Sequence, residues 1–282
     1  MTRTSARPNG HDDAPVTGAF PTRWRRPPQI LKHPGWRRTL LTGMVAYLLL
    51  AGWTLEVDWQ RVWEGLDRGW QFVEGFLVPD FFSRAKDIRE GLIESLAMTV
   101  TATALGIVLS VPFGVGAARN VSPAPVYLIC RSVIAVSRSL QEIIIAIFLV
   151  AMFGFGPFAG FATLSFATIG FLAKLLAEDI EEVDMAQVEA VRAAGGSWPQ
   201  VINYAVQPQV MPRLIGLSLY RLDINFRESA VIGIVGAGGI GATLNTAIDR
   251  YEYDSAGAIL LIIIGLVFAT EYLSGHIRKW VQ

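Results

Sequence analysis

Four charged side chains and one amide lie close together in a stretch of the sequence that is otherwise apolar. They are Arg221, Asp223, Asn225, Arg227 and Glu228. An ionised group near the centre of a bilayer costs about 2.5–3.5 kcal/mol, so these side chains must face protein or water. Asp223 and Arg227 are four residues apart with the acid first, which favours an ion pair on a helix. Two interpretations stay open. The residues could line a translocation path in which the planar donors of arginine bind an anion, or they could form a charge-balanced network where helices pack together.

A second candidate site follows directly, because Val231–Gly241 ends in a Gly-x-Gly-x-x-Gly pattern. The glycines of this region are Gly236, Gly238, Gly239 and Gly241. After a strand, such a pattern is the phosphate-binding fingerprint of a dinucleotide site and would indicate an oxidoreductase. That site also needs a βαβ unit and an acidic residue about 20 positions later, whereas here an apolar stretch begins at Ala256. We therefore expect no cofactor, and a glycine-rich bend at the outer end of a helix where other helices or a binding protein approach closely.

The composition indicates that the polar cluster at 221–228 and the glycine pattern at 236–241 belong to a membrane protein. Apolar residues make up 52% of the 282 positions and charged residues only 17%, and the mean hydropathy is +0.42. A soluble domain carries about 25% charged residues. The net charge is zero, which argues against nucleic-acid binding through phosphate neutralisation. With one cysteine, Cys130, and three histidines, an internal disulfide is impossible and a zinc site is not indicated.

Six apolar stretches are candidates for transmembrane helices, since the hydrocarbon core needs roughly 20 residues of helix. They are Leu40–Val57, Leu96–Ala118, Leu140–Phe155, Phe158–Leu176, Leu214–Val235 and Ala256–Ser274. The third and fourth are separated by the Gly-Pro pair at 156–157, which predicts a tight helical hairpin. Lys and Arg are more numerous in the segments that lie inside when the N-terminus is inside, so both termini are expected in the cytoplasm.

The chain divides into four parts on this basis. Residues 1–38 form a basic tail that we expect to be disordered, and residues 39–57 form the first transmembrane anchor. Residues 58–91 form an outer loop in which Trp59, Trp63 and Trp70 recur at helical spacing. Such a helix tends to lie in the membrane interface, where it would act as an anchor or as a docking platform for an extracytoplasmic partner. Residues 92–282 form the core.

The inner loop 177–213 has the pattern of a folded helix followed by a sharp turn. Asp184 can cap a helix that stops at the pair Gly195-Gly196. Glycine is the usual residue where a helix ends in a left-handed turn, because it has no side chain to oppose that conformation. The first half of the loop is therefore expected to be a capped helix that ends in a diglycine corner.

A second short helix is expected directly after the corner. Ser197 is followed three residues later by Gln200, which is the spacing of a capping box. The helix would cover Trp198–Val206 and end before Pro208. The two helices and the corner between them would form a hairpin at the inner face of the membrane.

This hairpin resembles the Glu-Ala-Ala loop of ABC importer permeases. That pattern is Glu-Ala-Ala, three residues, Gly, nine residues, Ile, one residue and Leu-Pro. Glu189, Ala190, Gly195 and Pro208 match it, and Val191, Ala205 and Gln207 differ from it. In the family, the corner fits a groove on the ATP-binding subunit and transmits its motion. The resemblance assigns this coupling role to Glu189, Ala190, Gly195, Gly196 and Pro208; the alternative is an ordinary helical hairpin.

Longer matches resemble the permeases of phosphonate importers. They are Arg138-Ser139, Glu142, the run Phe-Gly-Pro-Phe-Ala-Gly at 155–160, Ala177–Asp184 and Arg227–Gly241. Together they lie within residues 90–282, which makes 92–282 a permease core. The sequence departs from the family at Leu140-Gln141, where a proline is expected before the glutamate.

The resemblance implies an all-α integral membrane protein with six transmembrane helices, a type I ABC importer permease fold and a cytoplasmic coupling hairpin. It implies a transport subunit of the bacterial cell membrane for phosphonate or a related phosphorus oxyanion. Its partners would be a second copy of the chain, membrane lipid, an ATP-binding subunit and an extracytoplasmic solute-binding protein.

No Gly-x-x-x-x-Gly-Lys-Ser/Thr phosphate loop is present, so this chain should not be an enzyme, and ATP would be used by the partner. Two alternatives stay open. The chain could be a permease for another small solute such as an amino acid. It could also be a secondary transporter, which should show inverted repeats.

Overall fold

The computed structural model describes residues 34–55 and 58–281, and every regular element in these two ranges is a helix. The chain separates into two units, Met1–Trp63 and Glu64–Gln282. The first unit contains α1, Pro34–Thr54, at the place of the anchor expected at 39–57. Most of the tail predicted at 1–38 lies outside the described residues.

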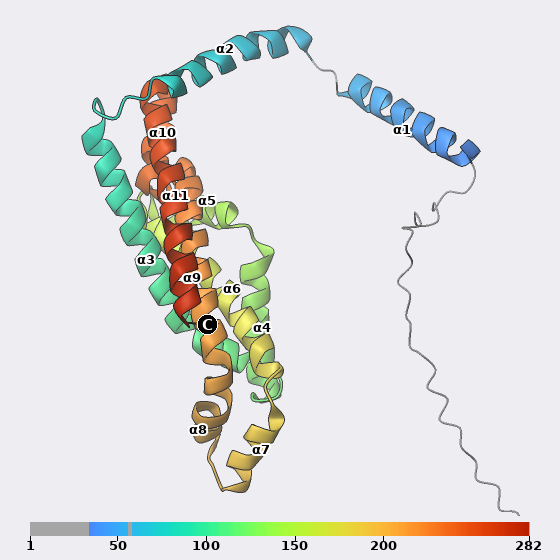
Figure 1. Ribbon diagram of the computed structural model, residues 1–282, viewed down its shortest axis with the longest axis vertical. Coiled ribbons are helices and arrows are strands. Elements are labelled where there is room, and N and C mark those ends of the chain that lie inside the picture. The colour runs from blue at the N-terminus through green and yellow to red at the C-terminus, as the bar shows by residue number, and fades with distance from the viewer. Residues whose placement is uncertain (1–33, 56–57, 282) are drawn as a thin grey trace, which may run out of the picture. The chain divides into compact units, whose positions relative to one another are not determined.

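The second unit is a helical bundle with α6 at its centre (Figure 1). Its elements follow in order: α2 (Trp59–Leu77, which starts in the first unit), α3 (Ala85–Gly116), α4 (Ala124–Ser139), α5 (Glu142–Phe153), α6 (Pro157–Glu181), α7 (Met185–Ala193), α8 (Trp198–Val201), η1 (Ile202–Val206), α9 (Gln207–Ile232), η2 (Gly233–Ala237), α10 (Gly239–Asp249) and α11 (Tyr253–Val281). The two η elements are π-helical turns. Since α6 packs against α3, α4, α5 and α9, the residues of α6 can contact most of the bundle.

Small residues allow α3 and α6 to form the most extensive contact of the bundle. A Cβ atom added at Gly106 would lie 2.5 Å from Cβ of Thr168, and one added at Gly114 would lie 3.0 Å from Cβ of Leu176. Helices in membranes associate through such close packing because lipid is as apolar as their side chains. The buried hydroxyl of Thr168 at this contact is satisfied within its own helix, where it donates to the carbonyl of Leu164 at 2.6 Å.

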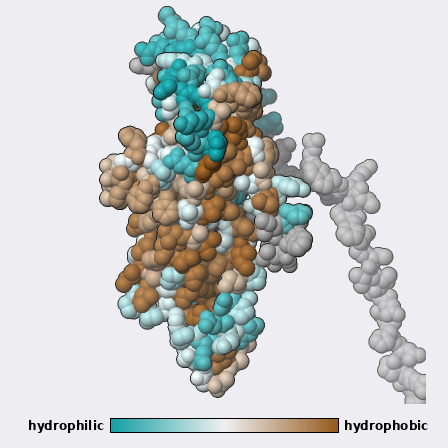
Figure 2. All heavy atoms as spheres, turned by 90° about the vertical axis from the view of Figure 1, so that its left-hand side faces the viewer, coloured by the Kyte–Doolittle hydropathy of each residue, from teal (hydrophilic) through white to brown (hydrophobic). Residues whose placement is uncertain are grey.

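The six spans that the sequence predicts are the upper end of the three to six that the described helices allow. The helices α3, α6 and α11 are each long and apolar enough to cross a membrane. Counting each bent pair of neighbouring helices as one span raises the number within the described residues to six. On the face drawn in Figure 2, apolar residues form a band between two polar ends. This distribution is the one that a membrane-spanning bundle requires.

The third expected span, Leu140–Phe155, coincides with one helix, α5, but this helix has only 12 residues and is too short to cross the hydrocarbon core alone. Helix α4, which was not predicted, precedes it, and the axes of α4 and α5 bend by 95°. Extended backbone causes the bend, with φ −103° and ψ 136° at Leu140 and φ −74° and ψ 144° at Gln141. The apolar run did not reveal α4 because this helix is amphipathic, with Ile134 buried against the bundle and polar side chains such as Ser132 on an exposed face.

The predicted second span, helical hairpin and outer loop can also be compared with the structure. The second span is longer than expected, since α3 begins at Ala85 and not at Leu96. The hairpin predicted at 156–157 is confirmed, because α5 ends at Phe153 and α6 begins at Pro157 after two glycines with positive φ. The tryptophan-rich segment of the expected outer loop is helical in α2, and its position in the membrane interface stays a prediction.

Candidate functional site

The segment between α6 and α9 contains the predicted glycine corner. Oδ1 of Asp184 accepts a hydrogen bond from the amide of Ala186 at 3.0 Å, which confirms the expected cap of α7. Gly195 adopts the left-handed conformation with φ +81°. The amide of Gly196 then donates to the carbonyl of Val191 at 3.0 Å, which closes the end of the helix.

The second half of the hairpin starts as predicted and ends differently. Ser197 and Gln200 form the capping box, in which Oε1 of Gln200 accepts from the amide of Ser197 at 2.7 Å. The expected end before Pro208 is wrong, because the π turn Ile202–Val206 leads directly into α9. Proline lacks an amide hydrogen, but the first turn of a helix needs no such donor. Pro208 lies in that first turn and therefore does not interrupt the chain.

The corner is anchored on one side and open on the other. Val188 of α7 is buried in an apolar cluster with residues of α6 and α9. Glu189 and Ala190 are exposed, and a Cβ atom added at Gly195 would meet nothing within 4 Å. A partner can therefore reach these residues without displacing any part of this chain, and their coupling role stays a prediction.

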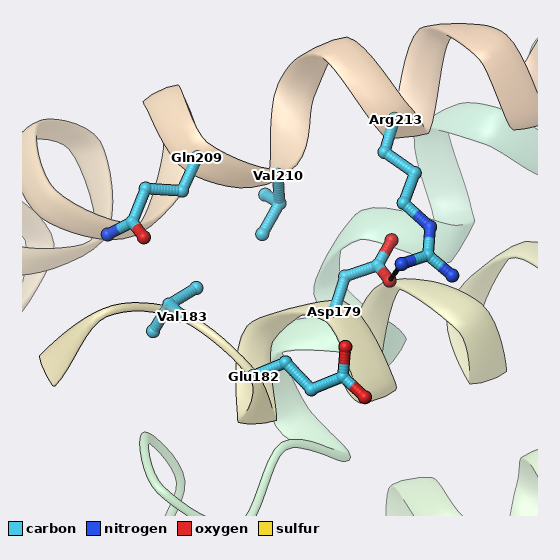
Figure 3. A pocket seen from close by; sticks show the side chains of 6 residues that line it. All are labelled: Asp179, Glu182, Val183, Gln209, Val210 and Arg213. Atoms are coloured by element: carbon cyan, nitrogen blue, oxygen red, sulfur yellow. Dashed lines mark ion pairs between the residues drawn. The ribbon is translucent and has the colours of Figure 1, made fainter. Parts of the chain in front are cut away.

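A pocket of about 180 Å³ lies at the base of the hairpin, between the end of α6 and the start of α9 (Figure 3). It is lined by Asp179, Glu182, Val183, Gln209, Val210 and Arg213. Nη1 of Arg213 lies 2.9 Å from Oδ1 of Asp179, the pair joined by the dashed line in Figure 3. The buried Oδ2 of Asp179 has no hydrogen-bond partner within the described part of the chain. Sequence reasoning did not select this pair because its members lie on different helices.

Arg221 lies on the side of α9 that faces α5 and α6, and its side chain is only 3% exposed. Its Nε donates to Oγ1 of Thr168 at 3.2 Å, and its Nη2 lies 3.5 Å from Oε1 of Glu142. Its guanidinium carbon lies 5.4 Å from the ring centre of Phe171, and that of Arg138 lies 5.6 Å from the same centre. Sequence reasoning named Arg138 and Glu142 only within a family match and did not select Phe171.

Asn225 is fully buried one helical turn beyond Arg221. Its Nδ2 donates to Oγ1 of Thr103 at 2.8 Å and to Oγ1 of Thr168 at 2.9 Å. Thr168 thus joins the side chains of Asn225 and Arg221, and the three helices α3, α6 and α9 share one polar network. The buried Oδ1 of Asn225 has no hydrogen-bond partner in the described part of the chain, and the choice between a path and a packing network stays open for this residue.

Asp223 and Arg227 lie on another side of α9, toward α11. The predicted ion pair is confirmed, with Nη2 of Arg227 2.7 Å from Oδ2 of Asp223. Thr270 of α11 donates to Oδ1 of Asp223 at 3.1 Å. Glu228 is half-buried and close enough to interact electrostatically with both Arg221 and Arg227. The five polar residues therefore divide into two groups, and their place in a translocation path stays a prediction.

The glycine-rich segment is a bend between two helices, as expected. The chain turns by 56° between the end of η2 and the start of α10. Gly236, Gly238 and Gly239 have φ values of +94°, +80° and +72°, which glycine adopts without the penalty of a side chain. A helix and not a strand precedes them, so the dinucleotide fingerprint lacks the context that it requires.

Contacts with other helices hold this bend tightly. The amide of Gly239 donates to Oε2 of Glu94 on α3 at 2.9 Å. A Cβ atom added at Gly241 would overlap the carbonyl oxygen of Ala230, and one at Gly233 would lie within 3 Å of three backbone atoms. These glycines are needed because backbone approaches backbone at this point.

An ion pair links the starts of α3 and α11 near the bend. The guanidinium of Arg84 donates to the carboxylate of Glu252. This hydrogen bond holds the pKa of Glu252 below its ordinary value. In the same region, the hydroxyl of Ser83 donates to Asp80 and lowers the pKa of that carboxyl group. Neither pair was selected by the sequence analysis.

With this geometry described, the chain can be compared with known proteins. Residues 110–282 match the family described as "Binding-protein-dependent transport system inner membrane component". The chain is 47% identical over 202 residues to the phosphate-import permease protein PhnE of Mycolicibacterium smegmatis, which covers 71% of this chain and 38% of that relative. The match therefore spans less than half of that relative's length.

A second relative matches along most of its length. The chain is 39% identical over 251 residues to the phosphite transport system permease protein PtxC of Stutzerimonas stutzeri, which covers 87% of this chain and 90% of that relative. Among solved structures, a chain of the inward-facing MetNI methionine ABC transporter has a TM-score of 0.59 at 23% identity, covering 69% of this chain and 96% of that chain. At this level of identity, the likeness shows that the two chains share a fold.

Proposed function

Because the chain belongs to the family of binding-protein-dependent transport system inner membrane components, we propose that it is the permease subunit of an ATP-driven importer for phosphonate or a related phosphorus oxyanion. It is a multi-pass membrane protein with the fold of type I ABC importer permeases. The names of the two relatives, one for phosphate import and one for phosphite transport, support the substrate class. The chain itself supplies the path, binds no cofactor and hydrolyses no ATP.

The open glycine corner is the observation that carries the coupling part of the proposal. Gly195 and Gly196 turn the chain so tightly that α7 and α8 present a small, exposed tip. The base of the tip is fixed, because Val188 is buried and Arg213 pairs with Asp179 below it. A rigid base and an open tip suit an element that fits a groove on an ATP-binding subunit and transmits its motion.

Three further partners belong to the proposal. An extracytoplasmic solute-binding protein would dock at the opposite end of the bundle, near the glycine bend. A second copy of the chain would complete a symmetric permease, and lipid would cover the rest of the apolar band seen in Figure 2. Both chain termini would lie in the cytoplasm, on the side of the coupling corner.

Uptake by cells tests the function. In a strain of the source organism that lacks this gene, uptake of methylphosphonate, phosphite and phosphate is measured separately, and each is also supplied as the sole phosphorus source. At least one of the three should fail to enter, and the full chain should restore its uptake. Methionine uptake serves as the control and should be unchanged.

The opposite pattern would contradict the proposal. If uptake of all three phosphorus oxyanions is normal in the deletion strain and methionine uptake is lost, the chain is a permease for an amino acid. Substantial ATP hydrolysis by the purified single chain would likewise contradict its assignment as a transport subunit.

A further inference from the structure

The break between α4 and α5 brings two arginines to one aromatic ring in the middle of the bundle. Phe171 lies near the centre of α6, and the guanidinium groups of Arg138 and Arg221 lie on it at 5.6 Å and 5.4 Å. A cation over the face of an aromatic ring is attracted to its negative face. Arg138 is exposed and Arg221 is buried, so the pair extends from the surface of the chain into its interior.

The first turn of α5 lies at the same place. This helix begins at Glu142, and the side chain of its N-cap residue, Gln141, makes no capping hydrogen bond. The N-terminus of a helix carries a partial positive charge and free amide donors. Helices that begin inside a membrane point this end at anionic groups in several transporters. Two guanidinium groups and one helix N-terminus thus meet at the α4–α5 break.

Glu142 is the anion that now faces Arg221. The distance of 3.5 Å between Nη2 and Oε1 exceeds the 2.7–2.9 Å of a strong charge-assisted hydrogen bond. By contrast, Arg227 and Asp223 on the other side of α9 are 2.7 Å apart. Glu142 is also partly exposed, at 24%. A loosely held, accessible carboxylate is one that another anion can replace at little cost.

We infer that Arg138, Arg221 and the first turn of α5 form an oxyanion-binding site in the translocation path, with Glu142 as the counterion that the solute displaces. Phe171 positions both guanidinium groups, and Thr168 holds Nε of Arg221 at 3.2 Å. The ligand is a tetrahedral phosphorus oxyanion, a class that rests on the proposed function. Asp223 and Arg227 are a structural link between α9 and α11 and do not contact the solute.

Direct binding of methylphosphonate tests this site. The full chain is placed in phosphatidylcholine nanodiscs, and binding is followed through the phosphorus NMR line width of the added methylphosphonate. Glu142→Gln removes the competing anion and should bind more tightly than the wild type. The double variant Glu142→Gln/Arg221→Gln removes both members of the pair, so that neither is left without the other. It should bind at least about tenfold more weakly, as expected when a hydrogen bond to a charged group is lost.

Two further variants separate binding from folding. Arg138→Gln changes an exposed side chain, and it should also weaken binding by about tenfold. The matched control is Asp223→Asn/Arg227→Gln, which removes an ion pair from the other side of α9. Its affinity should stay within about twofold of the wild type, because that pair lies outside the site. Thermal unfolding of every variant is measured alongside.

Equal affinity of the wild type and Arg138→Gln would overturn the inference, as would weaker binding by Glu142→Gln or no binding by the wild type. Equal loss of affinity in the Asp223/Arg227 control would assign the path to the opposite side of α9 and overturn it as well. The proposed function is decided separately by uptake in cells. A folded chain can thus fail this binding test while cells still import a phosphorus oxyanion through it.

Discussion

The two glycine corners of the bundle have the same backbone requirement and opposite surroundings. After the sides that the proposed function gives them, we call Gly195-Gly196 the cytoplasmic corner and Gly233–Gly241 the outer bend. At the cytoplasmic corner, Gly195 has φ +81°, and an added Cβ atom would meet nothing within 4 Å. At the outer bend, Gly236 has φ +94°, and an added Cβ atom would overlap the ring of Phe155. Positive φ explains why both positions are glycine, but Gly236 also needs glycine for space and Gly195 does not.

This difference separates internal packing from docking. The outer bend uses its lack of side chains to let α9, α10 and α3 approach one another. The cytoplasmic corner leaves the same space empty, and we propose that a partner subunit occupies it. Substitutions that add volume should therefore damage folding at one corner and transport at the other.

The largest effect is expected for Gly241→Val at the outer bend. The new side chain would overlap the carbonyl oxygen of Ala230, and the backbone around the bend would have to move. Overpacking of this kind costs about 3 kcal/mol or more when backbone atoms are displaced, so little folded protein should remain. Thermal unfolding and size-exclusion chromatography of the purified chain measure the effect.

The control is Gly265→Val on α11, where an added Cβ atom meets nothing within 4 Å. This variant should stay within about 0.5 kcal/mol of the wild type. If Gly241→Val and Gly265→Val unfold at the same temperature as the wild type, the outer bend is not the crowded corner described here.

Gly195→Trp should abolish transport while insertion stays normal and stability falls only by the about 1–2 kcal/mol that a side chain costs in the left-handed conformation. The bulky side chain would fill the open corner that the ATP-binding subunit has to accept, so uptake and stimulation of the partner ATPase should be lost. The amount of protein in the membrane should equal that of the wild type. Uptake assays at matched expression measure the outcome.

Gly195→Ala is the matched control, since it has the same unfavourable φ but little volume. The left-handed conformation costs about 1–2 kcal/mol for a residue with a side chain, so a small loss of stability with largely retained uptake is expected. Wild-type uptake by Gly195→Trp would show that this corner is not the coupling element.

The helix starts that follow the two corners are also capped differently. Ser197 caps α8 from within the corner itself, whereas the amide of Ile240 in α10 donates to Oγ of Ser95 on α3 at 2.9 Å. Ser197→Ala should therefore cost about 1 kcal/mol and should raise hydrogen exchange only in the short helix. Ser95→Ala leaves a buried amide without its acceptor and should cost about 1–3 kcal/mol across the α3–α10 contact. If both variants lose the same free energy of unfolding and raise hydrogen exchange only in the adjoining helix, this distinction is contradicted.

The smallest expected effect is a change in how the unfolding temperature depends on pH in the acidic range. The hydrogen bond from Arg84 holds the pKa of Glu252 below its ordinary value, so this pair stabilises the outer end fully above the ordinary glutamate pKa. The contribution is lost as the pH falls through the lowered pKa of the folded state. Glu252→Gln should make the unfolding temperature less dependent on pH in that acidic range, by a small amount because the pair is at the surface. An unchanged pH profile would show that the pair contributes no stability.

Features that depend on neighbouring residues could be predicted from the sequence. The cap at Asp184, the capping box of Ser197 and Gln200 and the ion pair of Asp223 with Arg227 each join residues at most four positions apart. Residue type and helical spacing are enough to predict such contacts.

Contacts between helices could not be predicted in this way. Arg138, Phe171 and Arg221 meet only because α4, α6 and α9 pack together, and no spacing in the sequence indicates that. The third span was predicted to begin at Leu140, but α4 before it and the bend of 95° between the two helices were missed, since the bend contains neither glycine nor proline. Pro208 misled the prediction because its place in a first turn depends on the π turn before it.

That π turn changes the phase of the helix that contains it. Val201 before the turn and Ala205 within it are buried four residues apart, and so are Val206 at the end of the turn, Val210 and Leu214. The interval of four residues is interrupted once, between two adjacent buried residues, because the turn holds one residue more than an α-helical turn. One residue corresponds to a rotation of about 100°. Without that extra residue, α9 from Val210 onward would be rotated by this angle relative to α8. If the hairpin of α7 and α8 kept its present orientation, Arg221 would then no longer face α6.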